Sequence, residues 1–165
     1  MAGSSRKRLG LDTNLLLDLA EGRDFAAEFR EEFQGLGYEL LISPTVAAEL
    51  NALSLYGGEP QKTLADQALR KLRQWKCQPF PLSDVKLAVA DRFAARLSEM
   101  GFIPDEEQND GRILAETSLA EIPLLVTSDK HLLNLEEESL LLVFNEADLL
   151  PVNPVHPRRL LKALR

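Results

Sequence analysis

The sequence predicts an α/β fold in which helices flank a central, mostly parallel sheet. Short apolar stretches alternate along the chain with segments of helical periodicity, as in folds built from strand–helix–strand units. The stretches at 38–42 and 123–127 are almost continuously apolar, which is typical of strands buried on both faces of a parallel sheet. The chain has 165 residues, enough for one domain with a single sizeable core.

The first elements are a strand and two helices. Arg8 to Leu11 is expected to form the first strand, and a helix from Asn14 to Ala20 should end at Gly22. Asp24 can cap a second helix, in which phenylalanines recur every four residues. This helix is expected to end at the glycines that precede the second strand.

The next elements are a buried strand and two more helices. Tyr38 to Ile42 is the second strand, and Ser43 and Pro44 follow it as the N-cap and first residue of a helix. A loop at Gly57–Gly58 separates that helix from an amphipathic one predicted for Thr63 to Trp75.

The rest of the chain is expected to repeat this alternation. A brief strand at Gln78 to Phe80 precedes a helix that Ser83 or Asp84 caps and that runs to about Met100. That helix should direct three apolar residues into the core: Val85, Val89 and Phe93. The remaining predicted elements are a helix from Asp110 to Ala120 and strands at Pro123 to Thr127 and Leu140 to Phe144.

Composition restricts the class of protein. No apolar run reaches the roughly 18 residues that a membrane-spanning helix needs. The single cysteine, Cys77, excludes an internal disulfide and fits a reducing cytoplasm, which is the expected location. The net charge of −7 argues against broad, non-specific attraction to nucleic acid. It leaves open a specific site whose acidic residues are neutralised by a bound cation.

Four acidic residues stand where strand patterns give way to helix patterns. They are Asp12, Glu49, Asp110 and Asp129. The carboxyl ends of parallel strands share one edge of a sheet, where ligands bind. Asp12 and Asp129 both follow apolar strands, and Glu49 lies just over one turn into the helix that Pro44 begins. We therefore expect the four side chains to converge at that edge.

Such a cluster is unfavourable without a cation. Two unit charges about 5 Å apart repel by roughly 3 kcal/mol at an effective dielectric constant near 20. Helix N-termini offset only about 0.3–1 kcal/mol each. Oxygen ligands without nearby cysteine favour Mg²⁺ or Mn²⁺ over zinc. The pattern thus predicts either a protonated carboxyl group or a divalent metal site.

Each acid also has a structural interpretation. Asp12, Asp110 and Asp129 precede helical segments and could serve as N-caps, and Glu49 could be an ordinary surface residue. Taken singly, these interpretations are favoured; it is the joint pattern that favours a site. His131 is interpreted as a surface or helix-start residue rather than a ligand.

Four short motifs resemble those of the PIN-domain ribonucleases, a family that includes the VapC toxins of toxin–antitoxin pairs. Leu11–Asn14 resembles the opening motif of the family, and Ser43–Leu50 resembles the second. Asn109–Ala115 resembles the third, and Leu125–Asp129 the fourth. All four occur in the family's order over most of the chain.

The resemblance implies a three-layer α/β/α sandwich with strand order 3-2-1-4-5. It implies a PIN-like nuclease domain over residues 6–150 and a C-terminal extension over 151–165, expected to be a short helix packed on the same domain. It also implies cleavage of single-stranded RNA with Mg²⁺ or Mn²⁺. By similarity, Asp12, Glu49, Asp110 and Asp129 would hold the metal, directly or through water. Polar neighbours would support these acids or face the substrate: Thr13, Asn14, Thr127 and Ser128.

Several alternatives remain open at this stage. A non-cleaving PIN-like module that binds RNA or protein is the main alternative function, although none of the four acids is missing. A haloacid-dehalogenase-type phosphatase is disfavoured because Asn14 stands where it needs a second aspartate. An antitoxin partner and a stand-alone RNA-processing role are both plausible. Leu53, Leu55 and Tyr56 could belong to a homodimer surface, with burial in the core as the favoured alternative.

Overall fold

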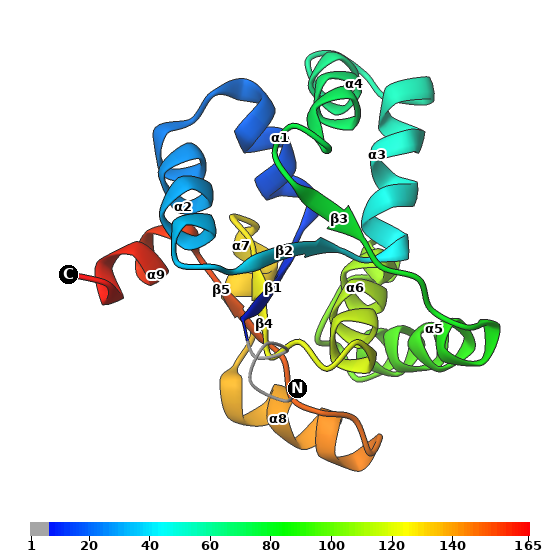
Figure 1. Cartoon of the computed structure of the whole chain (residues 1–165). Coiled ribbons are helices and arrows are strands. Elements are labelled where there is room, and N and C mark those ends of the chain that lie inside the picture. Colours follow the sequence, from blue (N-terminus) through cyan, green and yellow to red (C-terminus); the bar gives the residue numbers. More distant parts are fainter. Residues whose placement is uncertain (1–6) are drawn as a thin grey trace.

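A five-stranded, fully parallel sheet lies at the centre of the molecule. The computed structural model describes residues 7–165, so residue 6, where the predicted domain begins, lies outside the described residues. The strand order is β3-β2-β1-β4-β5, with helices on both sides of the sheet (Figure 1). The predicted α/β/α sandwich and strand order are thus confirmed. The strands are β1 (Arg8–Leu11), β2 (Glu39–Ile42), β3 (Cys77–Pro79), β4 (Leu124–Val126) and β5 (Asn153–Val155).

The central strand β1 pairs with β2 on one side and β4 on the other. Gly10 stands opposite Leu41 and Leu125 in the two pairings. A Cβ atom at Gly10 would lie 3.1 Å from Cγ2 of Thr117, so glycine here allows a helix to pack closely on the strand. The chain leaves β1 toward β2 and β3, then returns to β4 on the opposite side. The carboxyl ends of β1 and β4 therefore form the topological switch point, where open α/β sheets bind ligands.

The connecting helices begin and end at residues with clear physical roles. Ser43 accepts a hydrogen bond from the Val46 backbone N–H and caps the helix that Pro44 begins. Gly22 ends the first helix in the left-handed conformation, at φ 83°. The helices are α1 (Thr13–Glu21), α2 (Asp24–Gly35), α3 (Pro44–Tyr56), α4 (Gln61–Lys71), α5 (Asp84–Glu99), η2 (Asp105–Glu107), α6 (Gln108–Leu119), α7 (Lys130–Leu133), α8 (Glu137–Glu146) and α9 (Pro157–Ala163).

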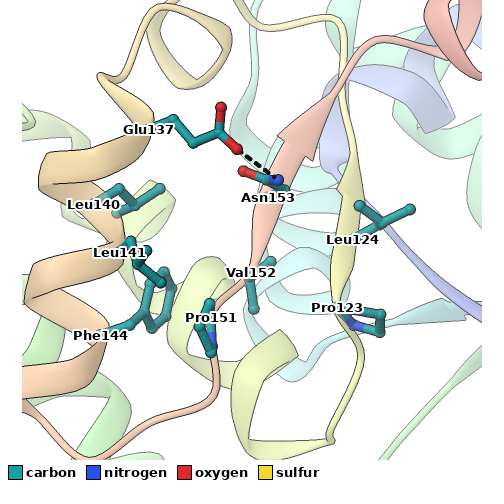
Figure 2. Close-up of a pocket in the computed structure, with 9 residues that line it drawn as sticks. All are labelled: Pro123, Leu124, Glu137, Leu140, Leu141, Phe144, Pro151, Val152 and Asn153. Atoms are coloured by element: carbon teal, nitrogen blue, oxygen red, sulfur yellow. Dashed lines mark hydrogen bonds between the residues drawn. The ribbon is translucent and has the colours of Figure 1, made fainter.

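The strand predicted at Leu140 to Phe144 is wrong, because this segment lies within α8. Leu140, Val143 and Phe144 are buried at helical spacing, whereas Leu141 and Leu142 remain exposed. Figure 2 shows Leu140 and Phe144 directed toward Val152, and Glu137 on the same helix accepting a hydrogen bond from Asn153 at 3.3 Å. A short apolar run cannot by itself distinguish a strand from a buried helical face.

Two helix predictions also need correction. In α5, Val85 is 74% exposed and Val89 is 38% exposed, and Phe93 alone of the three predicted residues is buried. The buried face of α5 consists instead of Ala90, Phe93, Ala94 and Leu97, since two alanines let a neighbouring helix approach closely. The helix predicted for Thr63 to Trp75 begins at Gln61 and ends at Lys71, and Trp75 is buried beyond its end.

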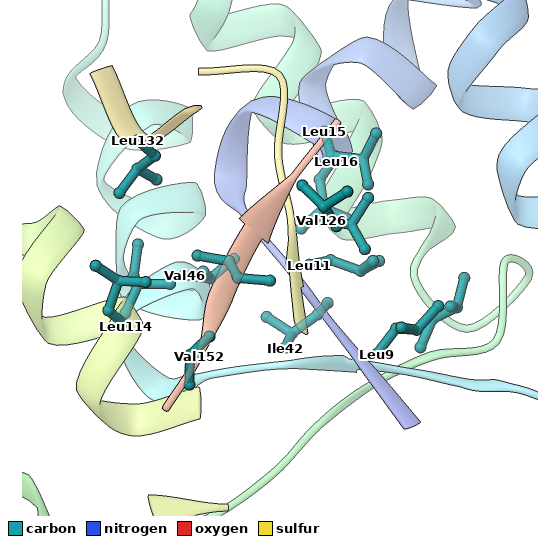
Figure 3. Close-up of a cluster of buried hydrophobic side chains, with 14 of the residues drawn as sticks. Leu9, Leu11, Leu15, Leu16, Ile42, Val46, Leu114, Val126, Leu132 and Val152 are labelled. Atoms are coloured by element: carbon teal, nitrogen blue, oxygen red, sulfur yellow. The ribbon is translucent and has the colours of Figure 1, made fainter. Parts of the chain in front are cut away.

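The core joins both faces of the sheet. Leu9 and Leu11 on β1 are almost fully buried and pack with residues of α1, α3 and α6 (Figure 3). Ile42 and Val126 extend this core across β2 and β4. Because successive residues of these strands are buried, the residues that follow them at the sheet edge are anchored to the core.

Residues 151–165 supply the edge strand β5 and the helix α9. β5 pairs with β4 through Val155 opposite Val126. α9 packs on α2, where the Arg158 guanidinium lies 4.8 Å from the Phe25 ring centre.

The apolar end of α3 is largely exposed. Leu55 is 63% exposed and Tyr56 is 85% exposed, so burial in the core was the wrong interpretation for both. Leu53 is partly buried against the core. Among residues 7–165, no helix combines the length and apolar character that crossing a membrane would require.

Candidate active site

All four acids identified from the sequence line one cavity of about 230 Å³ at the switch point. Asp12 stands between β1 and α1, Glu49 on α3, Asp110 near the start of α6, and Asp129 ahead of α7. The other residues that line it are Thr13, Asn14, Leu53, Glu106, Glu107 and Asn109. Six carboxylic acids therefore face one space, and none of the described residues lining it is a lysine or arginine.

Asp12 is the most deeply buried of the four, at 3% exposure. Its backbone N–H donates to the Val126 carbonyl at 3.0 Å, and its Oδ2 accepts from the Thr127 hydroxyl at 2.7 Å. Burial, helped by the charges of Glu49 and Asp129, raises the pKa of Asp12 to about 7 against the lowering effect of the Thr127 hydrogen bond. Asp12 precedes α1, but its side chain makes no capping bond.

Asp110 lies inside the first turn of α6 and is not its N-cap. The pKa of its carboxyl group is raised to about 8. Burial is the largest cause, and the negative charges of Asp12, Asp129, Glu107 and Glu49 add to it. Asp110 and Asp12 thus both hold a proton more readily than an ordinary aspartate.

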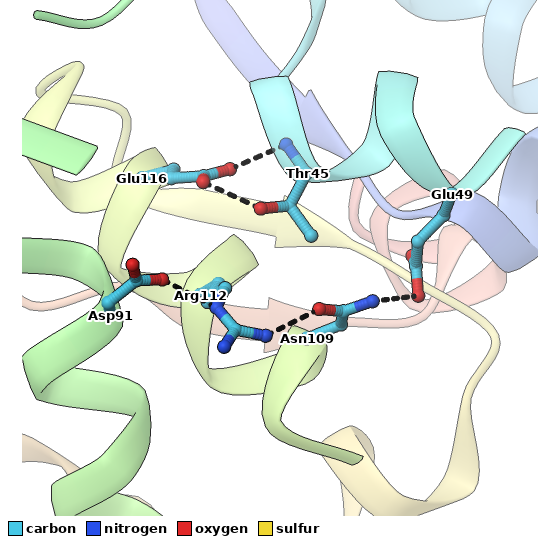
Figure 4. Close-up of polar contacts among 6 residues, drawn as sticks. All are labelled: Thr45, Glu49, Asp91, Asn109, Arg112 and Glu116. Carbon is cyan, nitrogen blue, oxygen red and sulfur yellow. Dashed lines mark hydrogen bonds and ion pairs between the residues drawn. The ribbon is translucent and has the colours of Figure 1, made fainter. Parts of the chain in front are cut away.

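Glu49 is fixed by two neutral donors. The Thr13 hydroxyl donates to Oε1 at 2.5 Å, and the Asn109 side-chain amide donates to Oε2 at 3.2 Å. Figure 4 shows the second bond, in which Glu49 on α3 faces Asn109 on α6. Glu49 is half-buried, so the surface interpretation does not describe it.

Asp129 does act as an N-cap. Its Oδ1 accepts from the His131 backbone N–H at 2.9 Å, and its own N–H donates to the Thr127 hydroxyl at 3.0 Å. His131 is exposed and pairs through Nδ1 with Glu107 at 2.7 Å. Asp129 therefore both caps α7 and lines the cavity.

The four polar neighbours identified from the sequence have different roles. Thr13 and Thr127 each donate to one of the acids, whereas exposed Asn14 lines the cavity. The Ser128 hydroxyl donates to Asp18 at 2.6 Å, outside the quartet. Burial raises the pKa of Asp18, and the Ser128 hydrogen bond opposes this shift.

Sequence reasoning missed several residues of the site. Glu106, Glu107 and Asn109 line the cavity together with Asp110. A signal was present for Glu106 and Glu107, because both belong to the acidic run that precedes α6. Thr45 and Glu116 gave no such signal: Glu116 is 2% exposed and accepts from the Thr45 backbone N–H at 2.9 Å and the Thr45 hydroxyl at 2.6 Å.

The donor set suits a hard divalent cation in its chemistry. Carboxylate and amide oxygens are the ligands that Mg²⁺ and Mn²⁺ accept. Burial, together with the negative charge of neighbouring acids, raises the pKa of Asp12 and Asp110 in this cavity. Within residues 7–165, however, no three His, Cys, Asp or Glu side chains are arranged as a group that could hold a metal ion.

Comparison with known proteins identifies the fold. No protein-family model and no curated protein matches the chain. Among solved structures, the chain resembles one from VapBC2 of Rickettsia felis bound to a promoter DNA fragment, with a TM-score of 0.58 and 16% identity over 89% of this chain and 98% of that chain. It resembles VapBC-1 of nontypeable Haemophilus influenzae with a TM-score of 0.56 and 15% identity over 92% of this chain and 98% of that chain.

A further similar structure is FitAcB from Neisseria gonorrhoeae. Its TM-score is 0.51 at 17% identity, over 90% of this chain and 97% of that chain. The likeness covers nearly the whole of each of these chains. The chain therefore has the PIN-like α/β/α fold of VapC-type proteins.

Proposed function

We propose that this protein is a divalent-metal-dependent endoribonuclease that cleaves single-stranded RNA in the cytoplasm. The observation that carries the proposal is the convergence of Asp12, Glu49, Asp110 and Asp129 on one cavity at the switch point of the sheet. The proposal draws further support from the four sequence motifs that resemble PIN-domain ribonucleases.

The four acids would hold Mg²⁺ or Mn²⁺, directly or through water. When bound, the cation would offset their mutual repulsion and the negative charge that develops on the phosphoryl oxygens. Thr127 would keep Asp12 oriented, and Thr13 and Asn109 would keep Glu49 oriented. Side chains fixed in this way lose little freedom when the metal and the RNA bind.

Asp110 is the carboxylate best suited to accept a proton from the attacking water. Glu49 already accepts a hydrogen bond on each oxygen, whereas no side chain in residues 7–165 donates to Asp110. Hydrolysis would leave a 5′-phosphate and a 3′-hydroxyl, as the family resemblance implies.

The decisive experiment compares Asp12→Asn and Asp129→Asn with the unaltered chain in Mn²⁺, using a single-stranded RNA of mixed sequence. Both variants should lose at least 100-fold in cleavage rate while RNA binding, measured by fluorescence anisotropy, is largely retained. Asp24→Asn is the matched control, since Asp24 is exposed at the start of α2 and lies away from the cavity.

Two outcomes would overturn the proposal. Full cleavage by both variants would remove Asp12 and Asp129 from the reaction, and the proposed four-acid site with them. RNA binding without any cleavage by the unaltered chain, at saturating Mn²⁺, would favour a binding module instead.

We further propose that the protein acts as the toxin of a toxin–antitoxin pair. The support is the fold, which it shares with chains of VapBC and FitAB complexes. The test is co-expression with the product of an adjacent small gene. Growth arrest that this product relieves, through a complex that co-purifies with the chain, is the expected result; arrest that it leaves unchanged would favour a stand-alone role.

A further inference from the structure

We propose that Arg112 is a positioning residue for Glu49 and acts through the side-chain amide of Asn109. This inference rests on the proposed function of the acidic cavity. Arg112 does not line that cavity, but a continuous set of hydrogen bonds joins it to Glu49 (Figure 4). Arg112 Nη1 donates to Asn109 Oδ1 at 2.7 Å, and Asn109 Nδ2 donates to Glu49 Oε2 at 3.2 Å.

The orientation of the Asn109 amide is the quantity that Arg112 controls. An asparagine amide carries an acceptor oxygen and a donor nitrogen of nearly equal size, so the group can turn over without changing its shape. Arginine has donors only, and it therefore requires Oδ1 of Asn109 on its side. Nδ2 is then left to face Glu49, which as a carboxylate can only accept.

Arg112 is itself held by Asp91 on α5. Its Nε donates to Asp91 Oδ1 at 2.6 Å, and the two side chains are 32% and 64% exposed. An ion pair this exposed contributes little to stability. Its effect is directional, because one arm of the planar guanidinium binds Asp91 while another arm reaches Asn109.

A second and separate link keeps α3 docked on α6. Buried Glu116 on α6 accepts two hydrogen bonds from Thr45 at the start of α3. This link does not involve Arg112 and lies one helical turn from Glu49 along α3. Replacing Arg112 should therefore leave the helices in place and release only the carboxylate.

Both carboxylate oxygens of Glu49 are held in place by hydrogen bonds. Thr13 holds Oε1 from the β1 side, and Asn109 holds Oε2 from α6. Without Arg112 the Asn109 amide can turn its oxygen toward Glu49, and the two acceptors would repel each other. Glu49 would then leave its position among the other acids of the cavity.

The test compares Arg112→Met and Arg112→Lys in the full chain. Arg112→Met removes the charged guanidinium group but keeps a long, unbranched side chain. Arg112→Lys keeps the charge but lacks a planar fork that can serve Asp91 and Asn109 together. Arg96→Met is the matched control, because Arg96 on the same helix as Asp91 pairs with Glu146 at 3.1 Å and is similarly exposed.

Two measurements are expected to respond. Mn²⁺ affinity, measured by titration calorimetry, should fall about 10-fold in Arg112→Met and be only partly rescued in Arg112→Lys, as when a hydrogen-bond partner of a metal ligand is lost. In the metal-free protein, the NMR signals of the Asn109 side-chain amide protons should shift and exchange faster with solvent in Arg112→Met, because the hydrogen bond to Glu49 is lost. Arg96→Met should change neither, and the thermal midpoints of all three variants should agree within a few degrees.

A double-mutant comparison separates positioning from a general structural effect. In an Asn109→Ala background, Arg112→Met should have no further effect on Mn²⁺ affinity. An equal loss in that background, or an Asn109 amide signal unchanged by Arg112→Met, would overturn the inference. Failure of the unaltered chain to bind Mn²⁺ would instead refute the proposed function, and the NMR comparison would still decide the role of Arg112.

Discussion

Thr127 divides a single hydroxyl group between two of the acids in the cavity. It donates to Asp12 and accepts from the Asp129 backbone N–H, and the side chain is fully buried. A hydroxyl has one proton to donate, so this proton is committed to Asp12. The relative positions of Asp12 and Asp129 thus depend on one residue of the β4 end.

Thr127→Val should destabilise the protein and disturb the cavity together. The change keeps the side-chain shape but leaves buried polar groups without a partner, which costs about 1–3 kcal/mol. It also removes the hydrogen bond that lowers the pKa of Asp12, so this pKa should rise. Urea unfolding gives the first effect, and the pH profile of cleavage gives the second as a shift to higher pH.

The matched control is Thr117→Val, which removes another buried hydroxyl. That hydroxyl bonds only to the Ile113 carbonyl within α6. A pH profile that moves equally in both variants would contradict a specific role for Thr127.

The metal-free protein should become less stable as the pH rises from about 4 to about 8. Asp110 and Asp12 keep their protons in the folded state up to pKa values of about 8 and about 7, whereas an unfolded aspartate loses its proton near the ordinary value of 3.8. In this window the folded state binds more protons than the unfolded state, so the free energy of unfolding falls with pH.

Urea midpoints in EDTA at pH 5 and pH 8 measure this dependence. Asp110→Asn should flatten it, because the group no longer ionises, whereas the exposed control Asp24→Asn should keep the original slope. A midpoint that rises over this interval in the unaltered chain would contradict the burial-based cause of the shifts.

Some residues of the site are placed by the local sequence pattern, and these could be predicted; others are placed by contacts between helices. Asp12 and Asp129 follow apolar strands, so the rule for parallel sheets is enough to locate them. Asn109 and Arg112 contribute through contacts between α3, α5 and α6, which no periodicity in the sequence encodes. Local pattern therefore located the acids but not the groups that hold them.

At the scale of elements, α5 and α6 pack closely enough to exclude even a methyl group. A Cβ atom at Gly111 would lie 2.8 Å from Ala94 Cα and 3.1 Å from Ile103 Cδ1. Gly111 directly follows Asp110, so the distance between these helices sets the position of that acid. The small residues of both helices are thus part of the construction of the site.

Gly111→Ala should therefore destabilise the protein, although alanine favours helix more than glycine does. The clash involves backbone, which cannot rotate away, and overpacking of this kind costs about 1–3 kcal/mol. Thermal unfolding should show a lower midpoint, with weaker Mn²⁺ binding because α6 moves.

Gly35→Ala is the control for helix propensity. A Cβ atom there meets nothing within 4 Å, so this variant should be neutral or slightly more stable. An equal gain in both variants would show that α5 and α6 tolerate the methyl group.

The failures of element prediction share a cause. Leu140 to Phe144 is apolar throughout, yet only the residues at helical spacing are buried in α8. Val85 and Val89 fit an inward face of α5 by pattern, but α6 packs against the alanine face instead. In each case the partner surface, rather than the local sequence, decides which residues are buried.

At the scale of the whole molecule, the sheet order follows from the alternation of elements together with the family resemblance. Alternation alone indicates a parallel sheet but not the order of its strands. The true fifth strand, Asn153–Val155, escaped prediction because it has three residues, one of them proline. Proline at a strand position usually marks an edge, and β5 is one of the two edge strands of the sheet.

Truncation should show how far the fold depends on this edge. A chain ending at Leu150 loses β5 and α9, and with them the buried residues Val152, Val155 and Leu161. β4 would then become an exposed edge, so we expect loss of cooperative unfolding by circular dichroism. A chain ending at His156 keeps β5 and should still unfold cooperatively, at a lower midpoint. Equal behaviour of the two truncations would contradict a special role for β5.

The N-cap role of Asp129 also determines how this acid can be altered without ambiguity. One of its oxygens secures the entry to α7, which leaves only the other available to anything bound in the cavity. Alanine at this position would loosen a helix and remove a ligand in a single step. Asparagine retains an oxygen for the cap while removing the charge. Asp129→Asn therefore separates the helix-capping role of the side chain from its role as a charged ligand.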